Sequence, residues 1–564
     1  MTATHRLPDI ARALREAVTL QQQGRLREAE KIYTRVLKAA PDQFDALNLL
    51  GTIKAQRGQA GEAYRLISAA LKVNPRAADA WVNLGIVLHA LKRDQEALES
   101  FDKALALKPR DADVLYQRGN TLLALGRAQD ALAAFHEVLA LLPSHPQARL
   151  NRGLALAGLG RHEDAIADFE VASANPPISP AAHYNRGLSL FNLGRYAEAV
   201  AAYDRALLLA PDHVKALNNR GFALQVLNRH NEALASYSRA LELQKDFADA
   251  HFNQAISLLT IGEFRRGFEK YEWRWRRTGM PTRRRSYGCP LWLGEYPLRG
   301  RTILLHAEQG LGDTIQFARY IGLLARAGAR VVLEVQPQLK ALLGQIEGVA
   351  AVVARGKPLP PFDVHCPLGS LPLSFKTELA TIPSTGSYLA ANDAHIDKWR
   401  PRLEALARPR VAVAWSGNPE HMNDRNRSIA LSRLAPLWSA GTARFVAIQR
   451  DLRSGDAELL AREPRVTQIG TELDDFADTA AVCTLVDLVI TVDTSVAHLA
   501  GAMGRPVWIL LPFSPDWRWT LEGESSCWYP SARLLRQPLL GDWDSVIERL
   551  RDELGRFAAV AKPL

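Results

Sequence analysis

The stretch 81–109, WVNLGIVLHALKRDQEALESFDKALALKP, decides the fold of the N-terminal half of the chain. It contains a glycine (Gly85), an alanine (Ala97), an aromatic residue (Phe101) and a proline (Pro109), and these residue types return every 34 residues. Because four series of residues share this period, chance similarity between the successive segments is excluded. The series are Gly51, Gly85, Gly119, Gly153, Gly187 and Gly221, continued by Ala255; Ala29, Ala63, Ala97, Ala131, Ala165, Ala199, Ala233 and then Gly267; Tyr33, Ile67, Phe101, Phe135, Phe169, Tyr203, Tyr237 and Tyr271; and Pro41, Pro75, Pro109, Pro143, Pro177 and Pro211, after which Lys245 breaks the series.

A repeat of this composition predicts stacked pairs of antiparallel helices. The small residues let two helices approach, the aromatic residue fills the gap between repeats, and the proline ends the second helix. One pair cannot bury its own apolar face, so the pairs stack into a superhelix. The pattern resembles the tetratricopeptide repeat, which has this period and these signature positions. We therefore predict an α-solenoid of eight repeats over residues 10–281.

The composition is that of an ordinary globular protein with several domains. Of the 564 residues, 47% are hydrophobic and 23% are charged, and a chain of this length exceeds a single core. No apolar run approaches the roughly 20 residues of a membrane span. The first residues lack the layout of a signal peptide, so we expect a cytoplasmic protein. The four cysteines are scattered, which predicts neither a disulfide framework nor a metal site.

Positive charge gathers in the segment Arg265–Arg285, which contains WRWRR and RRR. The net charge of the chain is +10. A run of basic residues can bind nucleic acid or any partner that carries phosphate, although most such runs simply lie on a solvent-exposed surface. Because no known nucleic-acid module accompanies this segment, we do not expect nucleic acid as a partner.

A polar series two residues before the repeat glycine predicts a binding surface. We call this series the asparagine ladder. Asparagine forms helices poorly, so its recurrence in the first helix of each pair needs a reason. First helices line the concave face of such arrays, where amides can hold the backbone of an extended peptide. The alternative is that duplication copied a harmless surface residue. The series also resembles the asparagine ladder of protein O-GlcNAc transferases, which implies guidance of acceptor polypeptides to a glycosyltransferase domain. The ladder consists of Asn83, Gln117, Asn151, Asn185, Asn219 and Asn253.

After Pro290 the pattern changes to alternating strands and helices, which predicts parallel sheets of α/β type. We expect a basic linker at residues 282–300 and two Rossmann-like lobes at residues 301–400 and 408–560, with ligands at the carboxyl ends of the strands. The predicted strands are RTILLHAE, RVVLEV, VAVAW, RFVAIQ, DLVITV and PVWILL. The predicted helices are residues 314–326, PQLKALLGQI, DKWRPRLEALAR, residues 431–438, SVAHLAGAMG and the final DWDSVIERLRDELGRF.

Two loops that follow predicted strands hold candidate ligand-binding residues. In the first, Gly310 and Gly312 permit a tight turn and close backbone approach, and Asp313 opens a helix. A helix cap is the simpler role for this aspartate, and residue type alone favours it. In the second, Ser416 is followed by a basic segment that includes Arg427, which suits phosphate recognition. An exposed basic loop is an equally good interpretation.

The third loop, DTSVAH, follows the predicted strand DLVITV and opens a helix. The amides and hydroxyls of Thr494 and Ser495 at a helix start can bind an anion without metal. His498 lies one turn later, on the same face of the helix. A lone histidine is usually structural, but this one follows a phosphate-type turn.

The sequences GLGDTIQFARYIGLL and VDTSVAHLAGAMGRP together resemble the ADP-heptose:lipopolysaccharide heptosyltransferase family. The resemblance spans roughly residues 300 to 550 and implies two-lobed glycosyltransferases of the GT-B fold. It implies that Asp313 is the general base, and that Asp493, Thr494 and His498 contact the nucleotide diphosphate of the donor. Three departures are present: Ser495 replaces a glycine, Arg427 stands nearest the place of a phosphate-binding lysine, and Ser-Ile replaces the Trp-Pro that follows it.

These observations predict a metal-independent, inverting glycosyltransferase that needs no cofactor. The donor is a nucleotide-diphosphate sugar, and the acceptor is a polypeptide on the concave face of the repeats. Repeat and glycosyltransferase fusions of this kind are typical of bacteria. One alternative is a non-enzymatic scaffold with a degenerate glycosyltransferase domain, and another is a glycolipid or polysaccharide glycosyltransferase. The residues expected to bind the donor are Gly310, Gly312, Ser416, Arg427, Asp493, Thr494, Ser495 and His498.

Overall fold

The computed structural model describes residues 10–278, 284–383, 386–421, 423–439 and 441–560. The chain forms two compact units, Met1–Asn219 and Arg220–Leu564. The boundary between them falls within a helix, α13 (Val214–Val226). The predicted boundary between repeats and linker, at residues 281 and 282, lies outside the described residues.

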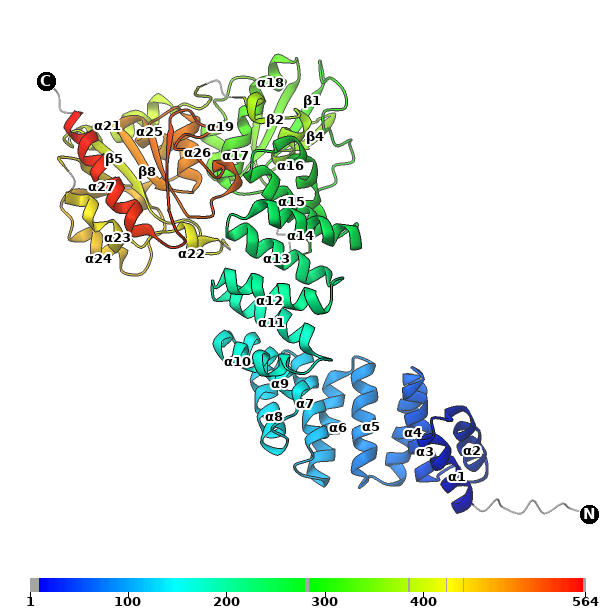
Figure 1. Ribbon diagram of the computed structural model, residues 1–564. Coiled ribbons are helices and arrows are strands. Elements are labelled where there is room, and N and C mark those ends of the chain that lie inside the picture. The colour runs from blue at the N-terminus through cyan, green and yellow to red at the C-terminus, as the bar shows by residue number, and fades with distance from the viewer. Residues whose placement is uncertain (1–9, 279–283, 384–385, 422, 440, 561–564) are drawn as a thin grey trace, which may run out of the picture. The chain divides into compact units, whose positions relative to one another are not determined.

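Paired helices fill the first unit and begin the second (Figure 1). Within the described residues there are sixteen, as eight repeats require. They are α1 (Ile10–Gln22), α2 (Leu26–Ala39), α3 (Phe44–Gln56), α4 (Ala60–Val73), α5 (Ala78–Ala90), α6 (Asp94–Leu107), α7 (Ala112–Ala124), α8 (Ala128–Leu141), α9 (Pro146–Gly158), α10 (His162–Ser173), α11 (Ser179–Asn192), α12 (Tyr196–Leu209), α13, α14 (His230–Leu243), α15 (Ala248–Thr260) and α16 (Phe264–Tyr271).

The repeat glycines allow the two helices of a pair to touch. A Cβ atom at Gly85 would lie 2.6 Å from the ring of Phe101, which is closer than carbon atoms pack. The same approach recurs in the other repeats, from Gly51 against Ile67 to Gly221 against Tyr237. The repeat glycines therefore have the predicted role of letting two helices approach, whereas the ring of Phe101 packs against the glycine of its own repeat.

The first parallel sheet lies in the second unit and has four strands in the order β3-β2-β1-β4. All its ladders are parallel, with Leu304 of β1 opposite Val332 of β2 and His365 of β4. Its strands are β1 (Thr302–His306), β2 (Arg330–Val335), β3 (Val349–Ala354) and β4 (Val364–Pro367). The helices of this part are α17 (Leu311–Phe317), α18 (Ile321–Arg326), α19 (Lys340–Leu343) and α20 (Leu371–Ser374). The next helix, α21 (Asp393–Glu404), packs against α25 (Phe476–Leu485) of the second sheet.

The second sheet is also parallel and has six strands in the order β10-β9-β8-β5-β6-β7. Helices cover both of its faces: α27 (Trp543–Val560) packs on one, and α25 (Phe476–Leu485) and α26 (Ser495–Ala502) pack on the other, as in a doubly wound fold. Its strands are β5 (Arg410–Ala414), β6 (Arg444–Ala447), β7 (Val466–Gln468), β8 (Leu488–Val492), β9 (Val507–Leu511) and β10 (Ala532–Arg536). Its helices are α22 (Asp424–Arg427), α23 (Leu431–Leu434), α24 (Asp456–Ala461), α25 (Phe476–Leu485), α26 (Ser495–Ala502) and α27 (Trp543–Val560).

The six predicted strands are present, and four further strands were missed. All four (β3, β4, β7 and β10) are edge strands of their sheets. Two of them, β4 and β7, have only four and three residues, so their apolar pattern is too short to signal a strand. The predicted helix at 314–326 begins earlier, at Leu311, and a 3-10 turn at Ala318–Tyr320 interrupts it.

One hydrophobic core runs through the last repeat and both sheets of the second unit. It includes Phe268 of α16, Leu305 of β1 and Val489 of β8, all fully or almost fully buried. The last repeat is therefore packed into the α/β region rather than tethered to it.

Candidate active site

The loop between β1 and α17 places Asp313 at the carboxyl end of the first sheet. The backbone N–H of Gly310 donates to Asp313 Oδ2 at 2.8 Å, so the aspartate does stabilise the start of the helix. Its other oxygen, Oδ1, accepts a hydrogen bond from Arg518, which follows β9 of the second sheet. The side chain of Asp313 is 24% exposed. The carboxylate can therefore cap the helix and also act chemically, because these two hydrogen bonds leave some of its acceptor positions free.

Sequence reasoning missed Arg518. This arginine is buried, and it donates to Asp516 at 2.8 Å and also to Gln316 and Asp313. The residues on either side, Trp517 and Trp519, pack in the core. An arginine between two tryptophans, just beyond a buried strand, was the available signal.

The loop after β8 brings the third predicted motif against the first. A Cβ atom at Gly312 would lie 2.6 Å from His498 Cδ2. The His498 ring stacks on Trp519, with centroids 5.3 Å apart, and its Nδ1 lies 2.9 Å from the Tyr529 hydroxyl. Burial lowers the pKa of His498 well below its usual value, helped by nearby arginines including Arg518, so this ring is neutral. The start of α26 and the start of α17 are thus in direct contact.

Asp493, Thr494 and Ser495 form the turn between β8 and α26. Burial raises the pKa of Asp493 to about 6, and the neighbouring carboxylate of Asp516 adds to this rise. Thr494 is the N-cap residue of α26, and its hydroxyl lies 3.1 Å from that of Thr491. The first amides of α26 belong to Ser495 and the residues after it. A helix start of this kind attracts negative charge.

The loop after β5 adds the second motif to the same place. The guanidinium of Arg427 covers Gly417, where a Cβ atom would lie 2.6 Å from Nη2, and Nη1 donates to the carbonyl oxygen of Asp493 at 3.0 Å. Within the described part of the chain, the buried Oγ of Ser416 has no hydrogen-bond partner. The second and third loops are therefore joined through Arg427.

All predicted donor-binding residues gather where the carboxyl ends of the two sheets meet. Asp313 contacts Arg518, Gly312 contacts His498, and Arg427 contacts Asp493. His421 lies among them, because the charges of Arg427, Asp516 and Asp313 all influence its pKa, which burial lowers. Among the described residues, no group of three or more His, Cys, Asp and Glu side chains is arranged to hold a metal ion.

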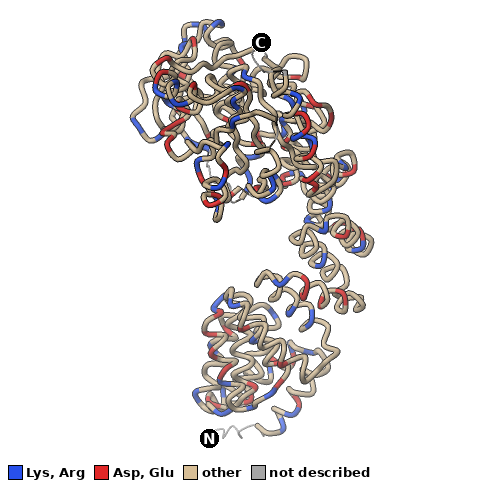
Figure 2. Tube along the Cα trace, turned by 90° about the vertical axis from the view of Figure 1, so that its left-hand side faces the viewer, with Lys and Arg blue, Asp and Glu red and all other residues tan. Residues whose placement is uncertain are grey.

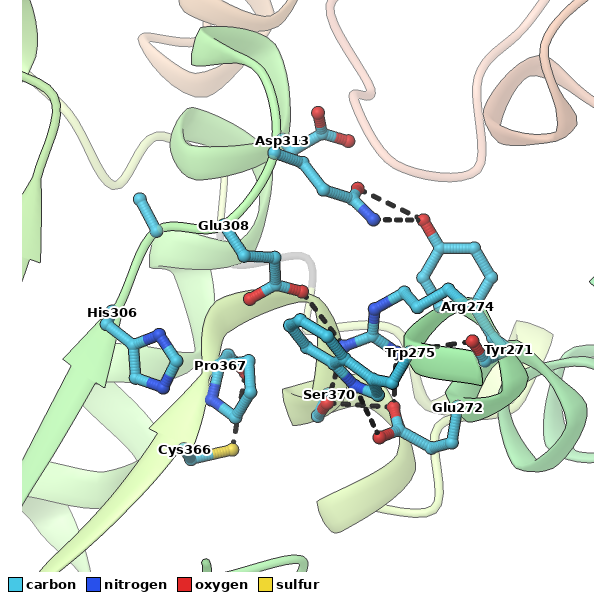
Figure 3. A network of polar contacts seen from close by, with 12 residues as sticks. Tyr271, Glu272, Arg274, Trp275, His306, Glu308, Asp313, Cys366, Pro367 and Ser370 are labelled. Carbon is cyan, nitrogen blue, oxygen red and sulfur yellow. Dashed lines mark hydrogen bonds and ion pairs between the residues drawn. The ribbon is translucent and has the colours of Figure 1, made fainter. Parts of the chain in front are cut away.

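Three arginines of the basic segment Arg265–Arg285 make internal contacts, and residues 279–283 of this segment lie outside the described residues. Arg274 is fully buried between the rings of Tyr271 and Trp275, and it donates to Glu308 at 2.9 Å and to Ser370 at 2.7 Å (Figure 3). Arg277 pairs with Asp249 at 2.7 Å, and Arg285 pairs with Glu334. Elsewhere in both units, basic and acidic residues are intermixed (Figure 2). The described residues of the segment therefore link the last repeat to the first sheet.

The asparagine ladder lies on first helices of the repeats, where all six side chains are half-buried. Asn83 donates to Asn48 at 3.2 Å, and Asn151 donates to Asn120 at 2.7 Å, so each reaches back to the preceding repeat. Asn185 bonds instead to its own helix, through the carbonyl oxygen of Ala181. Within the described residues, the amide oxygens of Asn83, Asn151 and Asn185 accept no hydrogen bond. These oxygens are the groups that a peptide N–H requires.

Two family profiles of the tetratricopeptide repeat match this chain. One matches residues 14–66, 54–112 and 116–180, and the other matches residues 180–213 and 214–247. The repeats are tetratricopeptide repeats. The pair α15 and α16 lies beyond the matched residues of the tetratricopeptide array.

Protein FlbA of Caulobacter vibrioides is 27% identical over 330 residues, which make up 54% of this chain and 54% of that protein. The chain thus spans about half the length of this curated relative.

Three solved structures are also similar. MamA is 25% identical and covers 28% of this chain and 91% of its own, with a TM-score of 0.27. YrrB, described as a tetratricopeptide repeat protein with an unusual peptide-binding site, is 24% identical and covers 33% and 95%, with a TM-score of 0.30. A tetratricopeptide repeat protein from Parabacteroides merdae is 18% identical and covers 44% and 98%, with a TM-score of 0.36.

None of the helices in the described part of the chain is both long enough and apolar enough to cross a membrane.

Proposed function

We propose that this chain is a cytoplasmic, inverting glycosyltransferase of the GT-B type, which transfers a sugar from a nucleotide-diphosphate donor to an acceptor hydroxyl. One observation carries the proposal. A partly exposed carboxylate, Asp313, lies at the meeting point of two parallel sheets, beside a set of groups that suit a diphosphate. Ligands of doubly wound sheets bind at such carboxyl ends.

The donor diphosphate has three sources of stabilisation in this proposal. Arg427 supplies a fixed positive charge and two or more N–H donors. The start of α26, at Thr494 and Ser495, supplies backbone amides and the positive end of a helix dipole. Ser416 supplies a buried hydroxyl with no other partner in the described residues. Because these groups stabilise the departing diphosphate, the proposed reaction needs no metal ion.

Asp313 is the general base of the proposed reaction. Its carboxylate removes the proton from the acceptor hydroxyl as that oxygen attacks the anomeric carbon. The bond from the anomeric carbon to the diphosphate breaks in the same displacement, so the configuration inverts and the nucleoside diphosphate leaves with the bonding electrons. Gly310 and Arg518 each occupy one oxygen of the carboxylate, and a carboxylate has about four acceptor positions. Lone pairs therefore remain for the acceptor.

The acceptor in this proposal is a polypeptide held by the tetratricopeptide repeats. Concave faces of such arrays are habitual binding surfaces. The half-buried amides of the asparagine ladder offer oxygen atoms to backbone N–H groups, so they can hold an extended chain with little regard for its sequence.

A calorimetric titration of the full chain with ADP, UDP, GDP and CDP, followed by their common sugar conjugates, tests the donor site. Saturable binding of one nucleotide and transfer from its sugar conjugate would support the proposal. Asp313→Ala should then abolish transfer while nucleotide affinity changes little. If a folded protein binds none of these nucleotides, the proposal fails and a non-enzymatic scaffold becomes the better interpretation.

A further inference from the structure

The last repeat differs from the first and the seventh at the residues around its aromatic side chain. In the seventh repeat, the Tyr237 hydroxyl donates to Gln225 at 3.1 Å, and Tyr33 of the first repeat donates to Gln21 at the same distance. Tyr271 occupies the equivalent position of the eighth repeat, 34 residues after Tyr237. There the glutamine position is taken by Leu259, so Tyr271 has no amide partner inside its own repeat.

A second substitution changes where the Tyr271 ring can lie. In the preceding repeat, a Cβ atom at Gly221 would lie 2.5 Å from the ring of Tyr237, so only glycine leaves room for that ring. The eighth repeat has Ala255 at this position. The alanine methyl group therefore excludes the Tyr271 ring from the place that its counterpart occupies.

Tyr271 bonds instead to the candidate catalytic loop. Its hydroxyl lies 3.0 Å from Gln309 Oε1 and 2.7 Å from Gln309 Nε2. Gln309 is followed directly by Gly310, whose N–H donates to Asp313. Burial raises the pKa of Tyr271 to about 12, so the hydroxyl keeps its proton and remains a donor.

Arg274 fixes the same loop one residue earlier. It donates to Glu308, and its guanidinium lies 4.8 Å from the centroid of the Tyr271 ring. A Cβ atom at Gly369 would lie 2.5 Å from Glu308 Oε1, so the Glu308 carboxylate is closely confined. The last repeat thus holds two consecutive residues, Glu308 and Gln309, through buried side chains.

From these contacts we propose that Tyr271 is a positioning residue for Asp313, so that the eighth tetratricopeptide repeat is part of the active site. This inference rests on the proposed function of Asp313. Its consequence is that a chain lacking the eighth repeat loses turnover even towards acceptors that do not use the repeats.

The sharpest test compares Tyr271→Phe with Tyr237→Phe in the full chain. Both variants remove one buried hydroxyl that bonds to a glutamine, but only Tyr271 bonds to the loop. Both should lower the urea midpoint by similar amounts. Loss of one hydrogen bond predicts about a 3- to 10-fold lower kcat for Tyr271→Phe. The donor KM should stay within about twofold, because Tyr271 contacts none of the proposed phosphate-binding groups. Tyr237→Phe should match the wild-type kcat.

Hydrogen exchange of the amides at residues 307–317 provides a readout that does not need activity. Exchange there should be faster in Tyr271→Phe than in Tyr237→Phe. Equal exchange in the two variants would overturn the inference, and so would equal kcat values. A wild-type chain that transfers no sugar from any donor would overturn the proposed function instead, and the exchange result would still decide whether the last repeat holds the loop.

Discussion

Gly312→Ala should force apart the starts of α17 and α26. The added methyl carbon would lie 2.6 Å from His498 Cδ2, whereas carbon atoms in contact lie about 3.5–4.0 Å apart. The His498 ring cannot yield easily, because it stacks on Trp519 and is hydrogen-bonded to Tyr529. The two helices must therefore separate by about 1 Å.

The expected effects on stability and turnover follow from this displacement. Overpacking of this kind costs about 1–3 kcal/mol of unfolding free energy, which the better helix propensity of alanine offsets by about 0.5–1 kcal/mol. A displacement of about 1 Å at a catalytic group can lower turnover about 100-fold. Urea denaturation and steady-state transfer kinetics measure the two effects.

Gly555→Ala is the matched control for this substitution. Gly555 lies in α27 of the same unit, and a Cβ atom there meets nothing within 4 Å. We expect wild-type turnover and stability that is unchanged or raised by up to about 1 kcal/mol. If Gly312→Ala behaves like this control, the contact between the two candidate loops does not constrain the active site and the reasoning fails.

Arg427→Ala should weaken nucleoside diphosphate binding at least several-fold, because a charge-assisted contact is lost. As a control, Arg433→Ala removes a partly exposed ion pair with Asp544 and should leave the dissociation constant for the nucleoside diphosphate, measured by calorimetry, unchanged. Equal dissociation constants for the two variants would show that Arg427 is not part of the binding site. Alanine at three ladder positions (Asn151, Asn185 and Asn219) should stop modification of a polypeptide acceptor while donor hydrolysis continues; unaffected transfer would place the acceptor elsewhere. His230 is buried, and among the described residues neither ring nitrogen has a hydrogen-bond partner. Burial lowers the pKa of His230 from 6.5 to about 4. The unfolded chain therefore binds more protons than the native chain below pH 6.5, and stability is lost as the pH falls from 6.5 towards 4. At pH 5 this loss is about 2 kcal/mol. His230→Leu should remove that part of the acid sensitivity in urea denaturation, and an unchanged pH profile would contradict the assignment.

The repeat array could be predicted almost completely from the sequence. Its contacts join residues of one repeat or of adjacent repeats, so Gly85 and Phe101 report their packing at a fixed spacing. Tetratricopeptide matches to residues 14–247 confirm the repeats. The central strands of both sheets were also predictable, because apolar residues dominate their runs. The edge strands were missed; β4 and β7 have only four and three residues, which is too short for a clear apolar pattern.

The candidate site was also predictable only in part. Its loops were recognised from residue types that follow predicted strands, and the glycosyltransferase activity assigned to them stays a prediction. Which loops meet could not be predicted, because Asp313 and Arg518 are separated by 205 positions and belong to different sheets. The sequence also placed Tyr271 in a repeat and indicated only a packing role for it.

By itself, the sequence determined the helical repeats, the parallel α/β region and the residue types available for chemistry. Each of these depends on short-range periodicity, which a linear pattern records. The tertiary structure alone decided that Arg518 pairs with Asp313, that Gly312 meets His498, and that the last repeat bonds to the loop before Asp313. Contacts of this kind join distant segments through single side chains, and the folded core, rather than any local pattern, brings them together.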